Sequence, residues 1–170
     1  NQGGVGSHNQ KDYLKNESSN GVKFINVSPL KSDLETVNEV EWISIKPNTD
    51  VALMLALCYE IYKSGATDRK FIDKYTVGFK KFTKYLIGDN DGVIKNAEWA
   101  SQITGLSSDA IFDLIKEIKE SKRTMISISW SLTRQSHGEQ PYWAAIALAS
   151  IIGDIGKPGG GIGFGYSAMN

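Results

Sequence analysis

The polar side chains best suited to binding chemistry gather in one stretch, residues 124–143, which reads TMISISWSLTRQSHGEQPYW. It begins with an alternating apolar run typical of a buried strand. It ends at Pro141, a residue that suits the first turn of a helix. Ligands of an open α/β sheet bind in the crevice beyond the carboxyl end of a strand. The stretch therefore predicts a ligand-binding loop, with these polar members: Ser131, Thr133, Arg134, Gln135, Ser136, His137, Glu139 and Gln140.

Two further polar loops also follow predicted strands. Val27, Ser28 and Pro29 close a strand predicted over residues 23–28, and residues 46–50 follow a second strand over 42–45. If the strands are parallel neighbours, all three loops gather at one edge of the sheet, where a nucleotide would lie.

The side chains in these loops each have two interpretations. The Asp50 carboxylate could accept hydrogen bonds from two adjacent N–H donors, such as those of guanine, but helix capping also explains residues 48–50. The Arg134 guanidinium suits a phosphate or a carbonyl group, or else a surface ion pair. Trp130 could stack on a ligand, pack in the core, or do both, and His137 is better explained as bracing its own loop.

We predict no catalytic residue and no metal ligand in this chain, because it lacks a complete set of catalytic groups. His8 and His137 are far apart and Cys58 is the one cysteine, so neither a zinc site nor a catalytic triad has the required spacing. Cys58 lies in an apolar helical run and is interpreted as a core residue rather than a nucleophile. The run GGGIGFG lacks the preceding strand and the Lys-Ser/Thr pair of a phosphate-binding loop, and is interpreted as a tight backbone passage.

The elements that must position these loops indicate one α/β domain. Predicted strands alternate with helices over residues 51–62, 68–75, 79–87, 97–103, 109–119 and 142–152, so helix exceeds strand and the sheet is mainly parallel. Residues 1–20 are expected to be loop or frayed, with a possible short helix around Tyr13 and Leu14. The chain does not begin with Met and stops just after a glycine-rich run, so we expect a piece excised from a larger protein.

The net charge and the hydropathy of the chain limit the classes of partner that it is predicted to bind. Lys plus Arg equals Asp plus Glu, at 19 each, so nothing indicates a nucleic-acid-binding surface. The apolar helix after Pro141 is shorter than the ~20 residues that span a bilayer, so no membrane span is predicted.

Several phrases of the chain resemble the dimethyl-sulfoxide reductase family of molybdenum enzymes: PNTDVALMLAL, DKYTVGFKKFTKYLIGDNDGV, AEWASQITG and SWSLTRQSHGEQPYWAAIALASIIGDIGKPGGGIGFG. The trimethylamine N-oxide, dimethyl sulfoxide and biotin sulfoxide reductases are the most similar members. The resemblance covers residues 21–165. It implies a Rossmann-like, doubly wound domain that holds part of a bis(molybdopterin guanine dinucleotide) molybdenum cofactor. It also implies three kinds of partner: the remaining domains of the same enzyme, a small S- or N-oxide, and an electron-donor protein that the chain does not identify.

The resemblance assigns cofactor contacts position by position. The family's Ile-Asp pair for guanosine falls on Val27 and Ser28, so a neutral hydroxyl stands where the family usually has a carboxylate. Its Pro-Gln-Thr-Asp loop for guanine falls on residues 47–50, and its Trp-x-x-x-Arg loop near the pterin falls on residues 130–134. The implied cofactor-binding residues are Val27, Ser28, Asn48, Thr49, Asp50, Trp130, Ser131 and Arg134.

In that family the metal is held by dithiolene sulfurs and one Ser outside the matched region. The resemblance therefore implies a cofactor-binding domain of an oxide reductase that transfers an oxygen atom, with no activity in the isolated piece. Two alternatives remain open: a non-catalytic α/β nucleotide-binding or assembly module, and the equivalent domain of a formate dehydrogenase or nitrate reductase. The family has periplasmic and cytoplasmic members, so the compartment also stays open.

Overall fold

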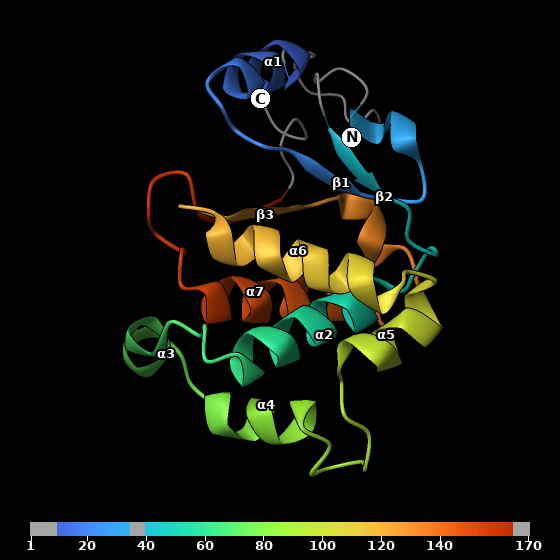
Figure 1. The fold of residues 1–170 in the computed structure, drawn as a ribbon, viewed down its shortest axis with the longest axis vertical. Coiled ribbons are helices and arrows are strands. Elements are labelled where there is room, and N and C mark those ends of the chain that lie inside the picture. Colours follow the sequence, from blue (N-terminus) through green and yellow to red (C-terminus); the bar gives the residue numbers. More distant parts are fainter. Residues whose placement is uncertain (1–9, 35–39, 165–170) are drawn as a thin grey trace. The chain divides into compact units, whose positions relative to one another are not determined.

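A computed structural model describes residues 10–34 and 40–164 of the chain (Figure 1). These residues form two compact units, one comprising the described residues up to Pro47 and the other comprising residues 48–164.

The first unit pairs two short parallel strands, β1 (Ile25–Val27) and β2 (Glu41–Ile43). Ile25 lies opposite Glu41 and Val27 opposite Ile43. The unit also contains helix α1 (Gln10–Ser19) and a 3-10 helix, η1 (Lys31–Leu34). The short helix expected around Tyr13 and Leu14 forms over residues 10–19, within the stretch 1–20 that is otherwise expected to be loop or frayed. Residues 1–9 lie outside the described residues.

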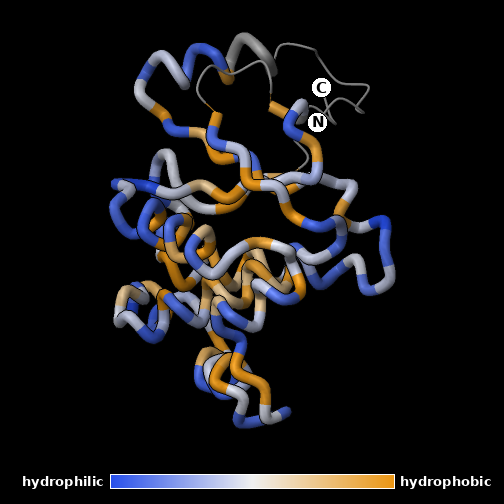
Figure 2. Tube along the Cα trace, turned by 45° about the vertical axis from the view of Figure 1, so that its right-hand side comes forward, coloured by the Kyte–Doolittle hydropathy of each residue, from blue (hydrophilic) through white to orange (hydrophobic). Residues whose placement is uncertain are grey.

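The second unit is built around two helices whose sequences are mostly apolar, α2 (Asp50–Lys63) and α7 (Gln140–Ile152), which pack against each other. α2 buries eight of its 14 residues and α7 buries six of its 13. Figure 2 shows hydrophobic residues concentrated among the central helices. Cys58 of α2 is fully buried, and this burial raises the pKa of its thiol. Cys58 is therefore a core residue, as the sequence predicts. The remaining helices of this unit are α3 (Arg69–Tyr75), α4 (Phe79–Leu86), α5 (Ala97–Thr104) and α6 (Ser108–Glu120).

A second parallel pair, β3 (Met125–Ile128) and β4 (Gly161–Phe164), packs against α7. Ile128 pairs with Phe164 at the carboxyl end of both strands. The Asp154 carboxylate accepts a hydrogen bond from the Thr124 backbone N–H at 3.0 Å, just before β3 begins. Its other oxygen lies 3.3 Å from Lys157 Nζ, within the turn that leads to β4. One buried carboxylate therefore fixes the start of the pair.

The α/β class, the parallel pairing and the excess of helix over strand are confirmed. Within the described residues, each strand is paired with one neighbour only, β1 with β2 and β3 with β4. The order of a single doubly wound sheet, and its status as one domain over residues 1–170, stay predictions. None of the described helices combines the length and hydropathy needed to cross a membrane.

Candidate functional site

A hollow of ≈ 440 Å³ lies where β3 and β4 end and α7 begins. It belongs entirely to the second unit. Its walls come from the loop after β3, from the first turn of α7 and from the last residue of β4. The residues that line it are Trp130, Thr133, Arg134, Glu139, Tyr142, Trp143 and Phe164.

Local hydrogen bonds shape the loop after β3 into a short 3-10 helix, η2 (Trp130–Thr133). The Ser129 hydroxyl accepts from the Ser131 N–H at 3.3 Å and is 3.0 Å from the Ser131 hydroxyl. The Thr133 hydroxyl donates to the Trp130 carbonyl at 2.8 Å, and the Arg134 N–H donates to the Ser131 carbonyl at 3.0 Å. Ser129, Thr133 and Arg134 each form a hydrogen bond with a residue less than four positions away. These short-range bonds fix the turn, which holds Trp130 and Arg134 at one side of the hollow.

The rest of the loop folds back tightly before α7. His137 has a left-handed backbone with φ 58°, a conformation that residues other than glycine rarely adopt. The neighbouring Gly138 is buried against the backbone of Thr133. The Tyr142 hydroxyl then donates to the Ser129 carbonyl at 3.2 Å, joining the first turn of α7 to the end of β3. The loop is therefore closed at both ends by contacts of its own residues.

The hollow combines exposed aromatic rings with one charge of each sign. Trp130, Trp143 and Phe164 are 47%, 62% and 60% exposed, which is unusual for such large apolar side chains. The backbone N–H of Glu139 holds the pKa of its carboxyl below its usual range, helped by the side chains of Gln140 and His137. Glu139 is thus an anion at neutral pH, and Arg134 is a cation. This arrangement suits a flat heteroaromatic ligand with both hydrogen-bond donors and acceptors at its edges.

Residues 48–50 also belong to the second unit, but they do not line the hollow. Asn48 has a left-handed backbone with φ 63°. Thr49 is the N-cap of α2, and its side chain makes no capping hydrogen bond. Asp50 is the first residue of α2. Burial raises the pKa of its carboxyl, and the opposing effect of its own backbone N–H is smaller. Asp50 is therefore a half-buried carboxylate at a helix start.

Val27 and Ser28 lie in the first unit, at the end of β1. Ser28 is buried, and its hydroxyl accepts from the Leu30 N–H at 3.1 Å. Its backbone N–H donates to the Ile43 carbonyl at 3.2 Å, and its carbonyl accepts from the Trp42 indole at 2.9 Å. These contacts fix the position of Ser28 at the carboxyl end of β1, as expected for a post-strand loop.

The structure thus brings two of the predicted site residues, Trp130 and Arg134, to one hollow, while Ser131 shapes the turn without lining it. Tyr142, Trp143 and Phe164 also line the hollow, and the sequence does not predict them as site residues. Trp143 lies in an apolar helix, so its sequence context predicts a core residue. Phe164 lies in the glycine-rich run that the sequence predicts to be a tight backbone passage, so the sequence gives no signal for its role in the site.

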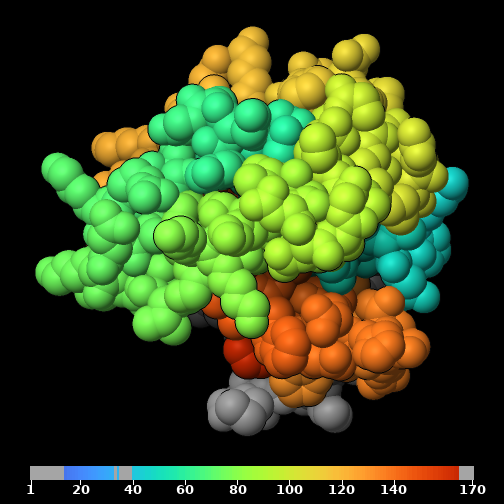
Figure 3. Space-filling view, turned by 90° about the horizontal axis from the view of Figure 1, so that it is seen from below, coloured from blue at the N-terminus to red at the C-terminus, as the bar shows by residue number. Residues whose placement is uncertain are grey.

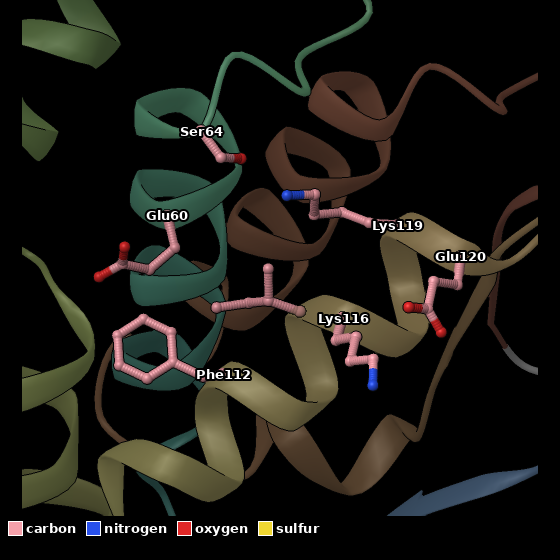
Figure 4. A pocket seen from close by; sticks show the side chains of 7 residues that line it. Glu60, Ser64, Phe112, Lys116, Lys119 and Glu120 are labelled. Carbon is pink, nitrogen blue, oxygen red and sulfur yellow. The ribbon is translucent and has the colours of Figure 1, made fainter.

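A second hollow of ≈ 330 Å³ lies between α2 and α6 (Figure 4). Its charged side chains are of both signs, with Glu60 from α2 and Lys116, Lys119 and Glu120 from α6. Glu60 accepts from the Ala97 N–H at 3.0 Å and so serves the start of α5. This hollow therefore has no set of polar groups that converge on one ligand. Across residues 10–34 and 40–164, no group of three or more His, Cys, Asp or Glu side chains is placed to hold a metal ion.

Comparison with known proteins gives a consistent result. Residues 5–168 match the family described as "Molybdopterin oxidoreductase". The chain is 49% identical over 167 residues to a biotin sulfoxide reductase of Cereibacter sphaeroides, covering 98% of this chain and 22% of that protein. It is 41% identical over 159 residues to a trimethylamine-N-oxide reductase of Haemophilus influenzae, covering 94% of this chain and 19% of that protein.

A solved structure, the acetylene hydratase from Pelobacter acetylenicus, has a similar fold, with a TM-score of 0.71 and 21% identity. The match covers 88% of this chain and 20% of that chain, and it bears on the fold alone. The chain spans about a fifth of the length of these relatives. Because the family match extends over nearly all of its residues, the chain belongs to the molybdopterin oxidoreductase family.

Proposed function

We propose that this chain is the molybdopterin-guanine-dinucleotide-binding domain of a molybdenum enzyme that reduces an S-oxide or N-oxide. The observation that carries the proposal is the hollow at the carboxyl end of β3, which joins Trp130 and Arg134 to two further exposed aromatic rings. The relatives named as biotin sulfoxide and trimethylamine-N-oxide reductases support the choice of substrate class. Formate dehydrogenase and nitrate reductase domains are less favoured, since the names of these relatives point to oxides.

The residues of the hollow fit a pterin. A pterin ring is flat and carries N–H donors and a carbonyl acceptor at its edges, so it suits a wall of Trp130, Trp143 and Phe164. The ionised Glu139 would accept from ring N–H groups, and Arg134 would donate to a carbonyl or phosphate oxygen. When bound, the molybdenum cofactor supplies two-electron oxygen-atom transfer, and the role of this chain is to bind and orient it.

The guanine end of the cofactor is assigned to Asp50 and its neighbours. The carboxylate of Asp50 can accept from two adjacent N–H groups of guanine, and such bonds would offset the burial that raises its pKa. Val27 and Ser28 are assigned to the guanosine ribose, which Ser28 would hold through a neutral hydroxyl. The metal-ligand residue, the second half of the cofactor site and the electron donor's docking site are assigned to the rest of the full-length enzyme.

The test is to replace Arg134 and Asp50 separately by Ala in the full-length enzyme and to measure bound guanine dinucleotide and oxide reduction. Each loss of a charge-assisted hydrogen bond should weaken binding by roughly 1.5–3 kcal/mol, or about 10- to 150-fold. Lys116→Ala and Asp113→Ala remove the same charges from the exposed face of α6 and serve as matched controls. Occupancy and turnover unchanged in both site variants would contradict the assignment. The isolated 170-residue chain is expected to show no reductase activity.

A further inference from the structure

Residues 69–86 concentrate positive charge in a chain whose total charge is balanced. This basic segment consists of α3, the turn 76–78 and α4. It holds one acidic residue, Asp73, whereas the whole chain balances 19 basic against 19 acidic residues. Its basic residues are Arg69, Lys70, Lys74, Lys80, Lys81 and Lys84.

All six basic side chains of the segment are exposed. None of them forms an ion pair with a carboxylate in the part of the chain that the structure describes. Two of them lie on aromatic rings instead: Arg69 is 4.9 Å from the centre of the Phe79 ring, and Lys74 Nζ is 5.0 Å from that of Tyr75. The Arg69 contact joins the start of α3 to the start of α4. The segment therefore presents uncompensated charge on a fixed framework.

Two large side chains project at the junction of the two helices, Tyr75 from the end of α3 and Val77 from the turn. Val77 is 99% exposed and Tyr75 is 63% exposed. The turn itself is well determined by local bonds, because the Thr76 hydroxyl donates to the Ile72 carbonyl at 2.8 Å and Gly78 starts α4 with a left-handed φ of 82°. Val77 is thus held outwards with no contribution to the core of the unit.

The basic segment is remote from the candidate site within the same unit. α3 packs on α7, whose last turn it meets through the bond from the Asp68 N–H to the Ile151 carbonyl, whereas the hollow lies at the first turn of α7. Figure 1 shows α4 on the side of α2 away from β3. Seen from below in Figure 3, the green part of the chain projects long side chains at the edge of this face.

We propose that the basic segment is a peripheral docking surface for an anionic membrane. Five of its six cations are Lys, which is depleted in protein interfaces but serves as a mobile point charge toward anionic headgroups. Val77 and Tyr75, flanked by these lysines, have the character of an interfacial anchor, with an aliphatic tip and an amphipathic ring. An acidic protein surface would match the charge but gives no reason for a fully exposed Val at the tip. This contact goes beyond the proposed function and does not depend on the cofactor.

The experiment uses the full-length enzyme and sedimentation with vesicles of phosphatidylcholine alone or mixed with an equal part of phosphatidylglycerol. Binding is expected only to the mixed vesicles and should weaken with added salt. The variant K80Q/K81Q/K84Q should lose on the order of 100-fold in affinity, at roughly fivefold per lysine. Val77→Ser, which changes an exposed residue, should lose roughly tenfold through lost apolar burial.

A matched control removes three positive charges elsewhere, at the exposed Lys116, Lys119 and Lys122. It should bind the mixed vesicles as the parent enzyme does. The proposal is overturned if the enzyme does not bind the mixed vesicles, if the control loses as much affinity as the α4 variant, or if Val77→Ser binds unchanged. Binding to poly-L-glutamate that needs Lys80, Lys81 and Lys84, without vesicle binding, would assign the segment to an acidic protein instead.

Discussion

A Cβ atom built on Gly138 would lie 2.1 Å from the carbonyl oxygen of Thr133. The loop that carries Arg134 therefore doubles back on itself with backbone against backbone, at a distance that only glycine permits. Gly138 is needed here for close approach rather than for a left-handed conformation, since the left-handed residue of this loop is its neighbour, His137.

Gly138→Ala should distort the hollow and lower the stability of the second unit. The clash is with backbone atoms, so the loop must move, at a cost of about 1–3 kcal/mol. We expect a lower midpoint of thermal unfolding and reduced cofactor content in the full-length protein. Gly156→Ala is the control: its backbone has φ 81° but nothing lies within 4 Å of the added Cβ. If Gly138→Ala loses no more stability than Gly156→Ala, the close approach of Thr133 does not govern position 138.

Replacement of Asp154 should separate its roles as hydrogen-bond acceptor and as anion. Asp154→Ala leaves the Thr124 N–H without its acceptor and leaves Lys157 without one of its carboxylates, so we expect a loss of roughly 1–3 kcal/mol in the free energy of unfolding. Asp154→Asn retains an acceptor for Thr124 and should lose less. Urea unfolding of the three proteins measures the order, and an Asn variant as unstable as the Ala variant would show that the charge dominates.

The Asp50 carboxyl should make stability depend on pH in the cofactor-free protein. Burial raises its pKa above the ordinary 3.8, so the folded state holds the proton more tightly than the unfolded state does. Stability from this group is present below pH 3.8 and is lost as the pH rises through the raised pKa of the folded state. Asp50→Asn should remove this loss, so its stability relative to the parent protein should grow across that window. Parallel pH profiles would contradict the prediction.

Much of the fold could be predicted because most helices of this chain have a local signal. The apolar periodicity of residues 109–119 predicts α6, and the Ser107 hydroxyl indeed accepts from the Ala110 N–H at its start. β4 could not be predicted in the same way, because two of its four residues are glycines with no strand propensity. That strand exists through its register with β3, which is a non-local relationship.

The candidate site was predictable only in part for a similar reason. A polar loop between two buried elements marked Trp130 and Arg134, which do share the hollow. Trp143 lines the hollow because its side chain is exposed. Whether a residue of an apolar helix is exposed depends on which neighbouring elements cover it. At residues 48–50 the sequence suggests a cap, but the left-handed Asn48 and the absent capping bond of Thr49 belong to backbone geometry that composition does not encode.

The pairing of each described strand with a single neighbour has a consequence for producing this chain by itself. A strand edge without a partner is a template for another chain, and natural sheets cover or close such edges. Met125 of β3 is 46% exposed, so this strand also presents apolar surface. We therefore expect the 170 residues expressed alone to aggregate by edge-to-edge association, and synthesis within the full-length polypeptide to prevent it.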